Sequence, residues 1–274
     1  MRANRDLGHG YFCVAVEAEG LSATFRPGQF FMLRVENGSD PLLPRAYSIY
    51  RMARSRRGRG ARVDLLYKVV GRGTAQLAGL RAGAAVDLLG PLGNAFTVPP
   101  GTRELLLVAG GIGVPPVVAL AEALAASRRN GRSGRSQRPA IVAFLGGRSK
   151  PDILCAADFR RAGARAGVAT EDGSAGERGL VTDLLERHLE GGSPAGRAIY
   201  ACGPPGMLRR IAELAAAHEV PGQLSMEAPM GCGIGICMGC AIPVRWHEAD
   251  GREAVRYRLC CTDGPVFEAD EVVW

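Results

Sequence analysis

The stretch that decides the fold is residues 104–116, ELLLVAGGIGVPP. Its first part, Glu104 to Ala109, has the largely apolar composition of a buried parallel strand, and a glycine-rich turn follows. Helical apolar spacing then runs from Pro115 to Ala126; proline is tolerated in a first helical turn because the N–H it lacks would have no partner there. Strand, glycine turn and helix in this order predict a parallel α/β sheet whose first turn can bind phosphate.

The same alternation continues toward the C-terminus. Apolar strands are expected at 140–145, before Asp172 and at 198–201, and helices at 158–162, 181–189 and 207–217. Strands that alternate with helices predict a parallel sheet with helices on both faces. Because the alternation starts near the Pro99-Pro100 pair and stops after Pro221, we expect an α/β domain over residues 100–222.

Residues 1–99 have a β-rich pattern. Short apolar runs at 12–16, 29–35 and 62–70 are separated by Gly and Pro punctuation. Several short strands at this spacing predict a small closed β-barrel.

Cysteines dominate the remaining segment, residues 223–274. Cys232, Cys237 and Cys240 follow the spacing C-x4-C-x2-C, and Cys261 arrives about twenty residues later. This is the plant-type arrangement for four thiolates around a [2Fe–2S] cluster. The glycines between the first three allow a loop to wrap closely around a small inorganic core.

The side chains between these cysteines are apolar: Ile234, Ile236 and Met238. We expect them to limit the access of water to the cluster and to influence its reduction potential.

Other interpretations of the cysteines compete. A structural zinc site also uses four thiolates, but more often as two C-x2-C knuckles. A disulfide set is disfavoured because the chain shows no secretion signal, and plain buried thiols rarely lie in a glycine-rich loop. The fourth ligand is ambiguous, because Cys260 and Cys261 are neighbours and only one can face the cluster. Cys13, Cys155 and Cys202 are expected in the core or in pockets.

Composition narrows the protein class. Of 274 residues, 47% are hydrophobic and 22% charged, as in ordinary globular proteins. No apolar run has the length of a membrane span, and the N-terminus leads into no signal-peptide core. We therefore expect a cytoplasmic protein without membrane contact.

The net charge of +7 is concentrated in two arginine-rich tracts, residues 51–62 and 127–138. Both lack interleaved aromatic residues, so we interpret them as solvated loops and expect no nucleic-acid binding.

Two turns of the α/β domain suit a dinucleotide. Gly111 and Gly113 would let the backbone approach a pyrophosphate, although Pro116 replaces the third glycine of the usual fingerprint. Cys202-Gly203-Pro204 closes the last predicted strand, and ligands lie at the carboxyl ends of such strands. Both turns should face one crevice, although each alone could be purely structural.

Two segments of the barrel suit a flavin nucleotide. Arg45-Ala46-Tyr47-Ser48 brings a cation, an aromatic ring and a hydroxyl together, with Arg45 and Tyr47 on one face. Gly71-Arg72-Gly73-Thr74 opens a helix, where a phosphate could bind. Taken alone, each is as compatible with a structural role as with a functional one.

Together these motifs resemble the ferredoxin reductase superfamily, in which R-x-Y-S, G-G-x-G-x-x-P and C-G-P-x-x-M recur. The resemblance is most specific to the electron-transfer subunits of dihydroorotate dehydrogenase type B. It is carried by residues 90–96 (GPLGNAF), 171–174 (EDGS), the cluster loop 227–240 and 261–267 (CTDGPVF).

This resemblance implies FAD in the barrel, NAD in the α/β domain and a [2Fe–2S] cluster at the C-terminus, with Cys261 rather than Cys260 as fourth ligand. It implies that Arg45 holds FAD phosphate, Tyr47 packs on the flavin ring and Ser48 bonds near its reactive edge. The other cofactor-binding residues it implies are Gly73 and Thr74 for pyrophosphate, Gly111 and Gly113 for NAD, Cys202, Gly203 and Pro204 beside the nicotinamide, and Ala46, Lys68, Val69 and Val70.

The resemblance also implies a partner. An FMN-containing catalytic subunit would oxidise dihydroorotate and pass electrons through the cluster and FAD to NAD, in a heterotetramer of two subunits of each kind. The alternative is a flavin and iron–sulfur reductase that serves another redox partner. Arg148, after the second strand of the α/β domain, leaves NAD and NADP both open.

Overall fold

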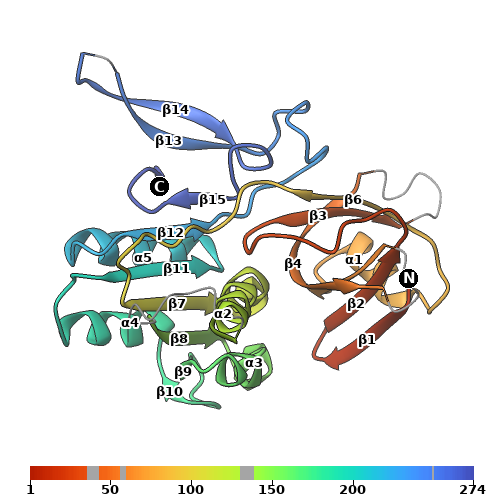
Figure 1. The fold of residues 1–274 in the computed structure, drawn as a ribbon, viewed down its shortest axis with the longest axis horizontal. Coiled ribbons are helices and arrows are strands. Elements are labelled where there is room, and N and C mark those ends of the chain that lie inside the picture. Colours follow the sequence, from red (N-terminus) through yellow and green to blue (C-terminus); the bar gives the residue numbers. More distant parts are fainter. Residues whose placement is uncertain (36–42, 56–59, 130–138, 249) are drawn as a thin grey trace.

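The computed structural model describes residues 1–35, 43–55, 60–129, 139–248 and 250–274 (Figure 1). Its N-terminal part is a six-stranded antiparallel sheet in the order β1-β2-β5-β4-β3-β6. The strands are β1 (Ala3–Gly8), β2 (Tyr11–Ala18), β3 (Phe30–Val35), β4 (Arg45–Arg54), β5 (Ala61–Lys68) and β6 (Val86–Leu92), with helix α1 (Arg72–Gly79) between the last two.

The edges of this sheet meet at the N-terminus. The Met1 ammonium donates to the Ala84 carbonyl at 2.7 Å, and the Gly83 N–H donates to the Met1 carbonyl at 3.0 Å. The sheet thereby closes around a core that includes Phe31 and Leu65, which confirms the predicted barrel.

The second sheet has seven strands in the order β10-β9-β8-β7-β11-β12-β15. All neighbours pair in parallel except the last pair, β12 with β15. The strands are β7 (Glu104–Gly110), β8 (Ala140–Gly147), β9 (Arg165–Thr170), β10 (Glu177–Arg178), β11 (Arg197–Cys202), β12 (Gly222–Ser225) and β15 (Val266–Glu268).

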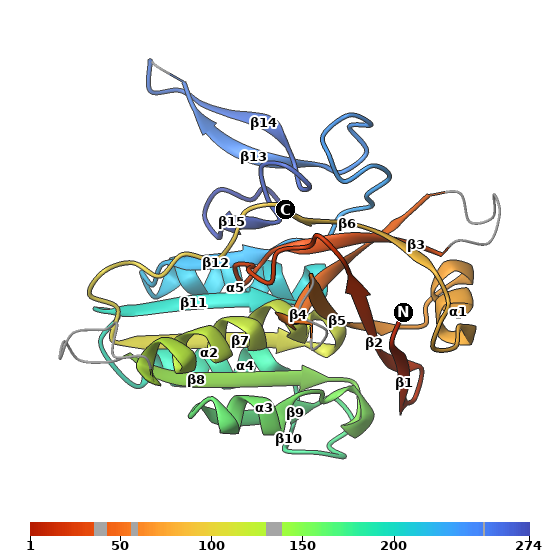
Figure 2. The same ribbon diagram turned by 45° about the vertical axis from the view of Figure 1, so that its right-hand side comes forward.

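Helices cover both faces of this sheet (Figure 2). On one face Val117 and Phe159 belong to a core beneath α2 and α3, and on the other Leu185 and Ile211 belong to a core beneath α4 and α5. The helices are η1 (Gly111–Gly113), α2 (Val114–Arg129), η2 (Lys150–Asp152), α3 (Ala156–Arg161), α4 (Val181–Glu190) and α5 (Pro205–Ala217). Within the described residues, none of the helices combines the length and apolar character that a bilayer crossing requires.

The C-terminal segment returns to the sheet after building a hairpin. Strands β13 (Ala241–His247) and β14 (Glu253–Leu259) pair with each other and project from the body of the molecule (Figure 1). The chain then enters β15, whose Phe267 pairs in register with Leu224 of β12. The cysteine segment is therefore joined to the α/β sheet by a strand.

The predicted alternation of strands and helices is confirmed, with some differences. Strand β12 spans the predicted 222/223 boundary, and β10, β12 and β15 were not expected. The interpretation of residues 51–62 as a solvated loop is wrong at both ends, because β4 continues to Arg54 and β5 begins at Ala61. Helix α2 likewise extends into the 127–138 tract as far as Arg129; residues 56–59 and 130–138 lie outside the described part of the chain.

Candidate cofactor sites

A cleft of about 490 Å³ opens on the barrel. Seven of the predicted cofactor-binding residues line it: Arg45, Ala46, Tyr47, Ser48, Lys68, Val70 and Thr74. Desolvation raises the pKa of the Tyr47 phenol to about 12, so this side chain is a neutral aromatic surface at physiological pH. A fixed cation, a flat ring, a hydroxyl and the exposed apolar Val70 together fit a flavin nucleotide.

The helix that starts beside this cleft uses Thr74 for its own capping. The Thr74 hydroxyl accepts from the Val70 N–H at 2.9 Å and donates to the Gly71 carbonyl at 2.9 Å. The Arg45 guanidinium packs against Gly73, because a Cβ there would lie 2.5 Å from the guanidinium carbon. Val69 is not in the cleft lining; its N–H donates to the Gly10 carbonyl at 2.8 Å.

A second cleft, of about 540 Å³, opens at the carboxyl ends of β7, β8 and β11. It is lined by the predicted Gly111, Gly113, Gly203 and Pro204, so both turns face one crevice. Gly111 has φ +53°, a conformation that favours glycine, and it leads into α2. At a helix N-terminus, backbone N–H groups that no side chain covers can bind the pyrophosphate of a dinucleotide.

The two turns also pack directly on each other. A Cβ on Gly113 would lie 2.5 Å from the Cys202 carbonyl oxygen, and one on Gly203 would lie 2.5 Å from the Met207 methyl. The Cys202 side chain is buried below the turn and outside the cleft lining, and burial raises the pKa of its thiol. These glycines therefore allow close backbone contact as well as an open site.

The two clefts meet at three residues, Lys68, Ile112 and Glu227, which line both. Desolvation raises the pKa of Glu227 above its ordinary value. Tyr11 and Asp152 also line the dinucleotide cleft next to Lys68. Tyr11 and Asp152 carry no local motif that would mark them. Glu227 begins the cluster loop quoted above, but it was not predicted to line a cofactor cleft.

The four predicted cluster ligands form two pairs. The Cys232 sulfur accepts the N–H of Cys237 at 3.4 Å and that of Ile234 at 3.5 Å, and these bonds lower the pKa of its thiol to about 6. Cys240 and Cys261 are both buried, and burial together with the Cys240 side chain raises the pKa of Cys261 to about 11. Two thiolates for each iron is the ligand set of a [2Fe–2S] cluster, so these residues fit it.

Across the described residues, no three His, Cys, Asp or Glu side chains lie close enough together to hold a metal ion.

The structure distinguishes the neighbouring cysteines at 260 and 261. The Cys260 thiol donates to the carbonyl of Met226, just before the loop, at 3.4 Å, and burial raises its pKa to about 12. Cys261 interacts with the Gly235 backbone and the Cys240 side chain. The contact of Cys261 with a second predicted ligand, Cys240, favours Cys261 as the fourth ligand.

The cluster loop lies against the barrel. A Cβ on Gly233, whose φ is +76°, would lie 2.4 Å from Met32 of β3. Asn94, which follows β6, donates to the carbonyls of Asp263 at 2.9 Å and Val266 at 2.8 Å. These contacts fix the loop beside the strand next to β4, which carries Arg45 to Ser48.

The apolar side chains that are expected to limit the access of water to the cluster are themselves exposed. Ile234, Ile236 and Met238 are 47%, 75% and 62% exposed. Their side chains form an outward apolar surface, which we call the loop face.

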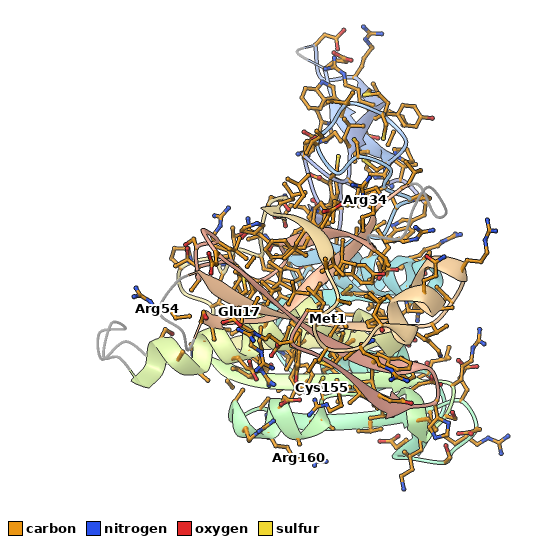
Figure 3. All side chains as sticks on the ribbon, turned by 90° about the vertical axis from the view of Figure 1, so that its right-hand side faces the viewer. Met1, Glu17, Arg34, Arg54, Cys155 and Arg160 are labelled. Carbon is orange, nitrogen blue, oxygen red and sulfur yellow. The ribbon has the colours of Figure 1, made fainter. Side chains whose placement is uncertain are left out.

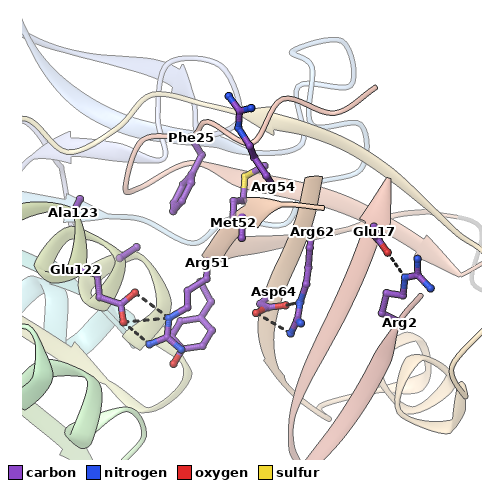
Figure 4. Close-up of a pocket in the computed structure, with 13 residues that line it drawn as sticks. Arg2, Glu17, Phe25, Arg51, Met52, Arg54, Arg62, Asp64, Glu122 and Ala123 are labelled. Carbon is purple, nitrogen blue, oxygen red and sulfur yellow. Dashed lines mark hydrogen bonds and ion pairs between the residues drawn. The ribbon is translucent and has the colours of Figure 1, made fainter. Parts of the chain in front are cut away.

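A separate ion cluster joins the barrel to the α/β part. Arg51 of β4 donates from Nε to Glu122 of α2 at 2.9 Å (Figure 4). Arg51 Nη2 also donates to Asp158 of α3 at 2.6 Å, and Tyr50 donates to Asp158 at 3.0 Å. Cys155 lies where the barrel and α3 meet (Figure 3), and burial raises the pKa of its thiol to about 12, so it is an inert thiol.

Comparison with known proteins agrees with this geometry. Three family models match: an oxidoreductase FAD-binding domain over residues 8–96, an oxidoreductase NAD-binding domain over 107–213, and the iron-sulfur cluster binding domain of dihydroorotate dehydrogenase B over 227–273. A Bacillus caldolyticus protein described as "Dihydroorotate dehydrogenase B (NAD(+)), electron transfer subunit" is 40% identical over 90% of this chain and 87% of its own. The chain belongs to this family.

Another curated protein and two solved structures are similar to this chain. One from Desulforamulus reducens with the same description is 36% identical over 90% of this chain and 87% of its own. The solved structure of NADH-dependent reduced ferredoxin-NADP oxidoreductase has a TM-score of 0.79 and 26% identity, covering 100% of this chain and 88% of that one. Ferredoxin reductase in carbazole 1,9a-dioxygenase has a TM-score of 0.64 and 27% identity, covering 80% and 64%. The chain is thus an NAD-linked oxidoreductase subunit with FAD and iron–sulfur sites, and the zinc interpretation is set aside.

Proposed function

We propose that this subunit carries electrons between an FMN-bearing catalytic subunit, which oxidises dihydroorotate, and NAD. The observation that carries this is the continuity of the three sites. The flavin and dinucleotide clefts share Lys68, Ile112 and Glu227, and the cysteine loop packs on β3 of the barrel. A flavin exchanges electron pairs with a nicotinamide and single electrons with an iron–sulfur cluster, so it belongs between them.

The residues of each site have distinct roles in this proposal. Arg45 pairs with FAD phosphate, Tyr47 and Ser48 orient the flavin, and Ala46 and Val70 border it. Val69 holds the backbone between the lining residues Lys68 and Val70 through its bond to the Gly10 carbonyl. Gly73 makes room for the Arg45 guanidinium, while Thr74 shapes the helix start beside the phosphates. Gly111, Gly113, Gly203 and Pro204 form the dinucleotide site, and Cys202 supports it from below. Cys232, Cys237, Cys240 and Cys261 ligate the cluster.

At the level of the whole chain, we propose an FAD-binding unit over residues 1–99, an NAD-binding unit over 100–222 and a cluster-binding unit over 223–274. The exposed loop face covers the predicted cluster site and offers the shortest approach for a partner. A heterotetramer with two catalytic subunits follows from the family resemblance. A cytoplasmic location suits eight cysteines of which none forms a disulfide bond.

The test is an EPR spectrum of anaerobically purified subunit after addition of NADH. A rhombic reduced [2Fe–2S] signal is expected, because electrons from NADH must cross the flavin to reach the cluster. A signal with dithionite but none with NADH would contradict the proposed path. The absence of an EPR signal with both reductants, in protein that retains its iron, would contradict the [2Fe–2S] cluster as well.

A further inference from the structure

The turn that follows Cys261 is held by one side chain of the barrel. We call residues 262–265, which connect Cys261 to β15, the ligand turn. Asn94, which follows β6, donates from Nδ2 to the carbonyls of Asp263 at 2.9 Å and Val266 at 2.8 Å, and its Oδ1 accepts the Val266 N–H at 2.9 Å. Asn94 and Val266 are 172 positions apart in sequence, so only the fold brings them together.

An amide is the side chain that fits this position. The Asn94 Nδ2 donates to two carbonyl oxygens and its Oδ1 accepts from an N–H, so both polar atoms have partners. An ionised carboxylate of the same shape could not donate to the two carbonyls. The backbone adds a fourth bond, from the Asn94 N–H to the Gly264 carbonyl at 2.7 Å. The preceding Gly93 also packs on the ligand turn, since a Cβ there would lie 2.6 Å from Pro265 Cδ.

The ligand turn lies between the predicted cluster and the flavin cleft. At its start, the Cys261 side chain interacts with that of Cys240, a second predicted ligand. At its end, Pro265 lines the flavin cleft, and its carbonyl accepts at 2.8 Å the N–H of Met226, which lines the same cleft. A displacement of this turn would therefore move a cluster ligand relative to the flavin site.

We propose that Asn94 is a positioning residue for the cluster, because it holds the ligand turn and thereby the orientation of the Cys261 thiolate. The inference rests on the proposed function of the cysteine segment and adds a residue of the barrel to a site that the sequence placed in residues 223–274 alone. Asn94 acts through Cys261, in the way that residues around a metal site orient its ligands. Since Asn94 follows β6, it also ties the position of the cluster to the barrel that carries the flavin cleft.

The test measures the release of iron to a chelator from the anaerobically purified full chain with its flavin and cluster. N94A is expected to release iron about tenfold faster than wild type, because three side-chain bonds to the segment after Cys261 are lost. The g values of its reduced EPR signal should also shift, because the Cys261 side chain is no longer held in one orientation. N94S, whose single hydroxyl can replace only part of these bonds, should release iron at an intermediate rate and serves where N94A fails to fold.

The matched control is N4A, which removes a similar asparagine contact inside the barrel. The Asn4 Nδ2 donates to the Leu77 carbonyl at 2.7 Å, and its Oδ1 accepts from the Tyr67 hydroxyl at 3.0 Å. N4A should leave iron release and the EPR signal as in wild type. Equal acceleration of iron release by N94A and N4A would overturn the inference in favour of general destabilisation of the fold.

Two other results would overturn the inference. One is iron release from N94A at the wild-type rate. The other is faster release with an unchanged EPR signal, which would make Asn94 a general support of the segment rather than a residue that orients a ligand. If the wild-type chain retains no iron, the proposed function of the cysteine segment fails, which is a distinct result.

Discussion

At the scale of single residues, the neighbouring Cys260 and Cys261 are expected to have different roles, the first structural and the second as a cluster ligand. Both are buried, but the Cys261 side chain interacts with the Cys240 side chain and the Gly235 backbone, whereas the Cys260 thiol donates to the Met226 carbonyl. Cys261→Ser is therefore expected to lose most of the bound iron and the reduced EPR signal. Cys260→Ser, whose hydroxyl can donate to the same carbonyl, should retain both. Iron and sulfide analysis of the two purified variants decides this, and the reverse pattern would reassign the ligand.

The glycines of the dinucleotide turns allow a matched pair of stability tests. A Cβ on Gly113 would meet the backbone oxygen of Cys202 at 2.5 Å, and neither atom can rotate away. Gly113→Ala should lower the free energy of unfolding by about 1–3 kcal/mol. Gly206, in the first turn of α5, has open space around it, so Gly206→Ala should be neutral or stabilise by up to about 1 kcal/mol. Denaturant unfolding of both variants measures the difference, and similar losses would refute the packing explanation.

Much of the candidate site could be predicted at this scale because its residues lie in local motifs. Arg45 to Ser48 and the glycine turns are contiguous in sequence, and turn chemistry is local. Tyr11 and Asp152 could not be predicted, since 141 positions separate them and only the fold brings their oxygens together. The ligand choice between Cys260 and Cys261 was also undetermined by spacing, because it depends on which face of the segment meets the loop.

At the scale of elements, the ion cluster around Arg51 shows why a basic tract was misinterpreted. Arginines between Gly and Ser suggested a solvated loop, but β4 continues through them and points Arg51 at α2 and α3. The partners of Arg51 are two carboxylates from separate helices, and no local sequence pattern indicates them. The first part of that tract is thus a contact between elements.

This cluster predicts a pH dependence of stability. Burial alone would raise the pKa of Asp158, but hydrogen bonds from Arg51 and Tyr50 outweigh it, and the folded pKa lies below the ordinary value. A depressed carboxylate pKa stabilises the fold above the unfolded pKa of about 3.9, and this stabilisation is lost as pH falls through the folded pKa. Asp158→Asn should therefore lose about 1–3 kcal/mol at neutral pH, and less in acid. Denaturant unfolding of both proteins from neutral pH into acid checks this; a constant difference would contradict it.

At the scale of the whole molecule, the C-terminal segment is integrated with the other parts. Strand β15 completes the α/β sheet, Asn94 bonds to the chain around it, and the cysteine loop packs on β3. The sequence showed three compositional regions, and each has the expected kind of fold. Their interlocking could not be predicted, because β12 and β15 are short strands whose pairing depends on residues far apart in sequence.

This integration leaves the loop face as the outward end of the electron path, which predicts where the catalytic partner binds. Ile236 is 75% exposed on the loop face, so Ile236→Asp should weaken the complex with the catalytic subunit at least about tenfold. Val255→Asp is the matched control, because Val255 is 57% exposed on β14 of the hairpin, outside the loop face. Iron content and reduction by NADH should match wild type in both variants, since neither side chain is a ligand. Titration of the purified partner by calorimetry measures the affinities, and equal weakening by the two substitutions would argue that the partner covers the hairpin instead.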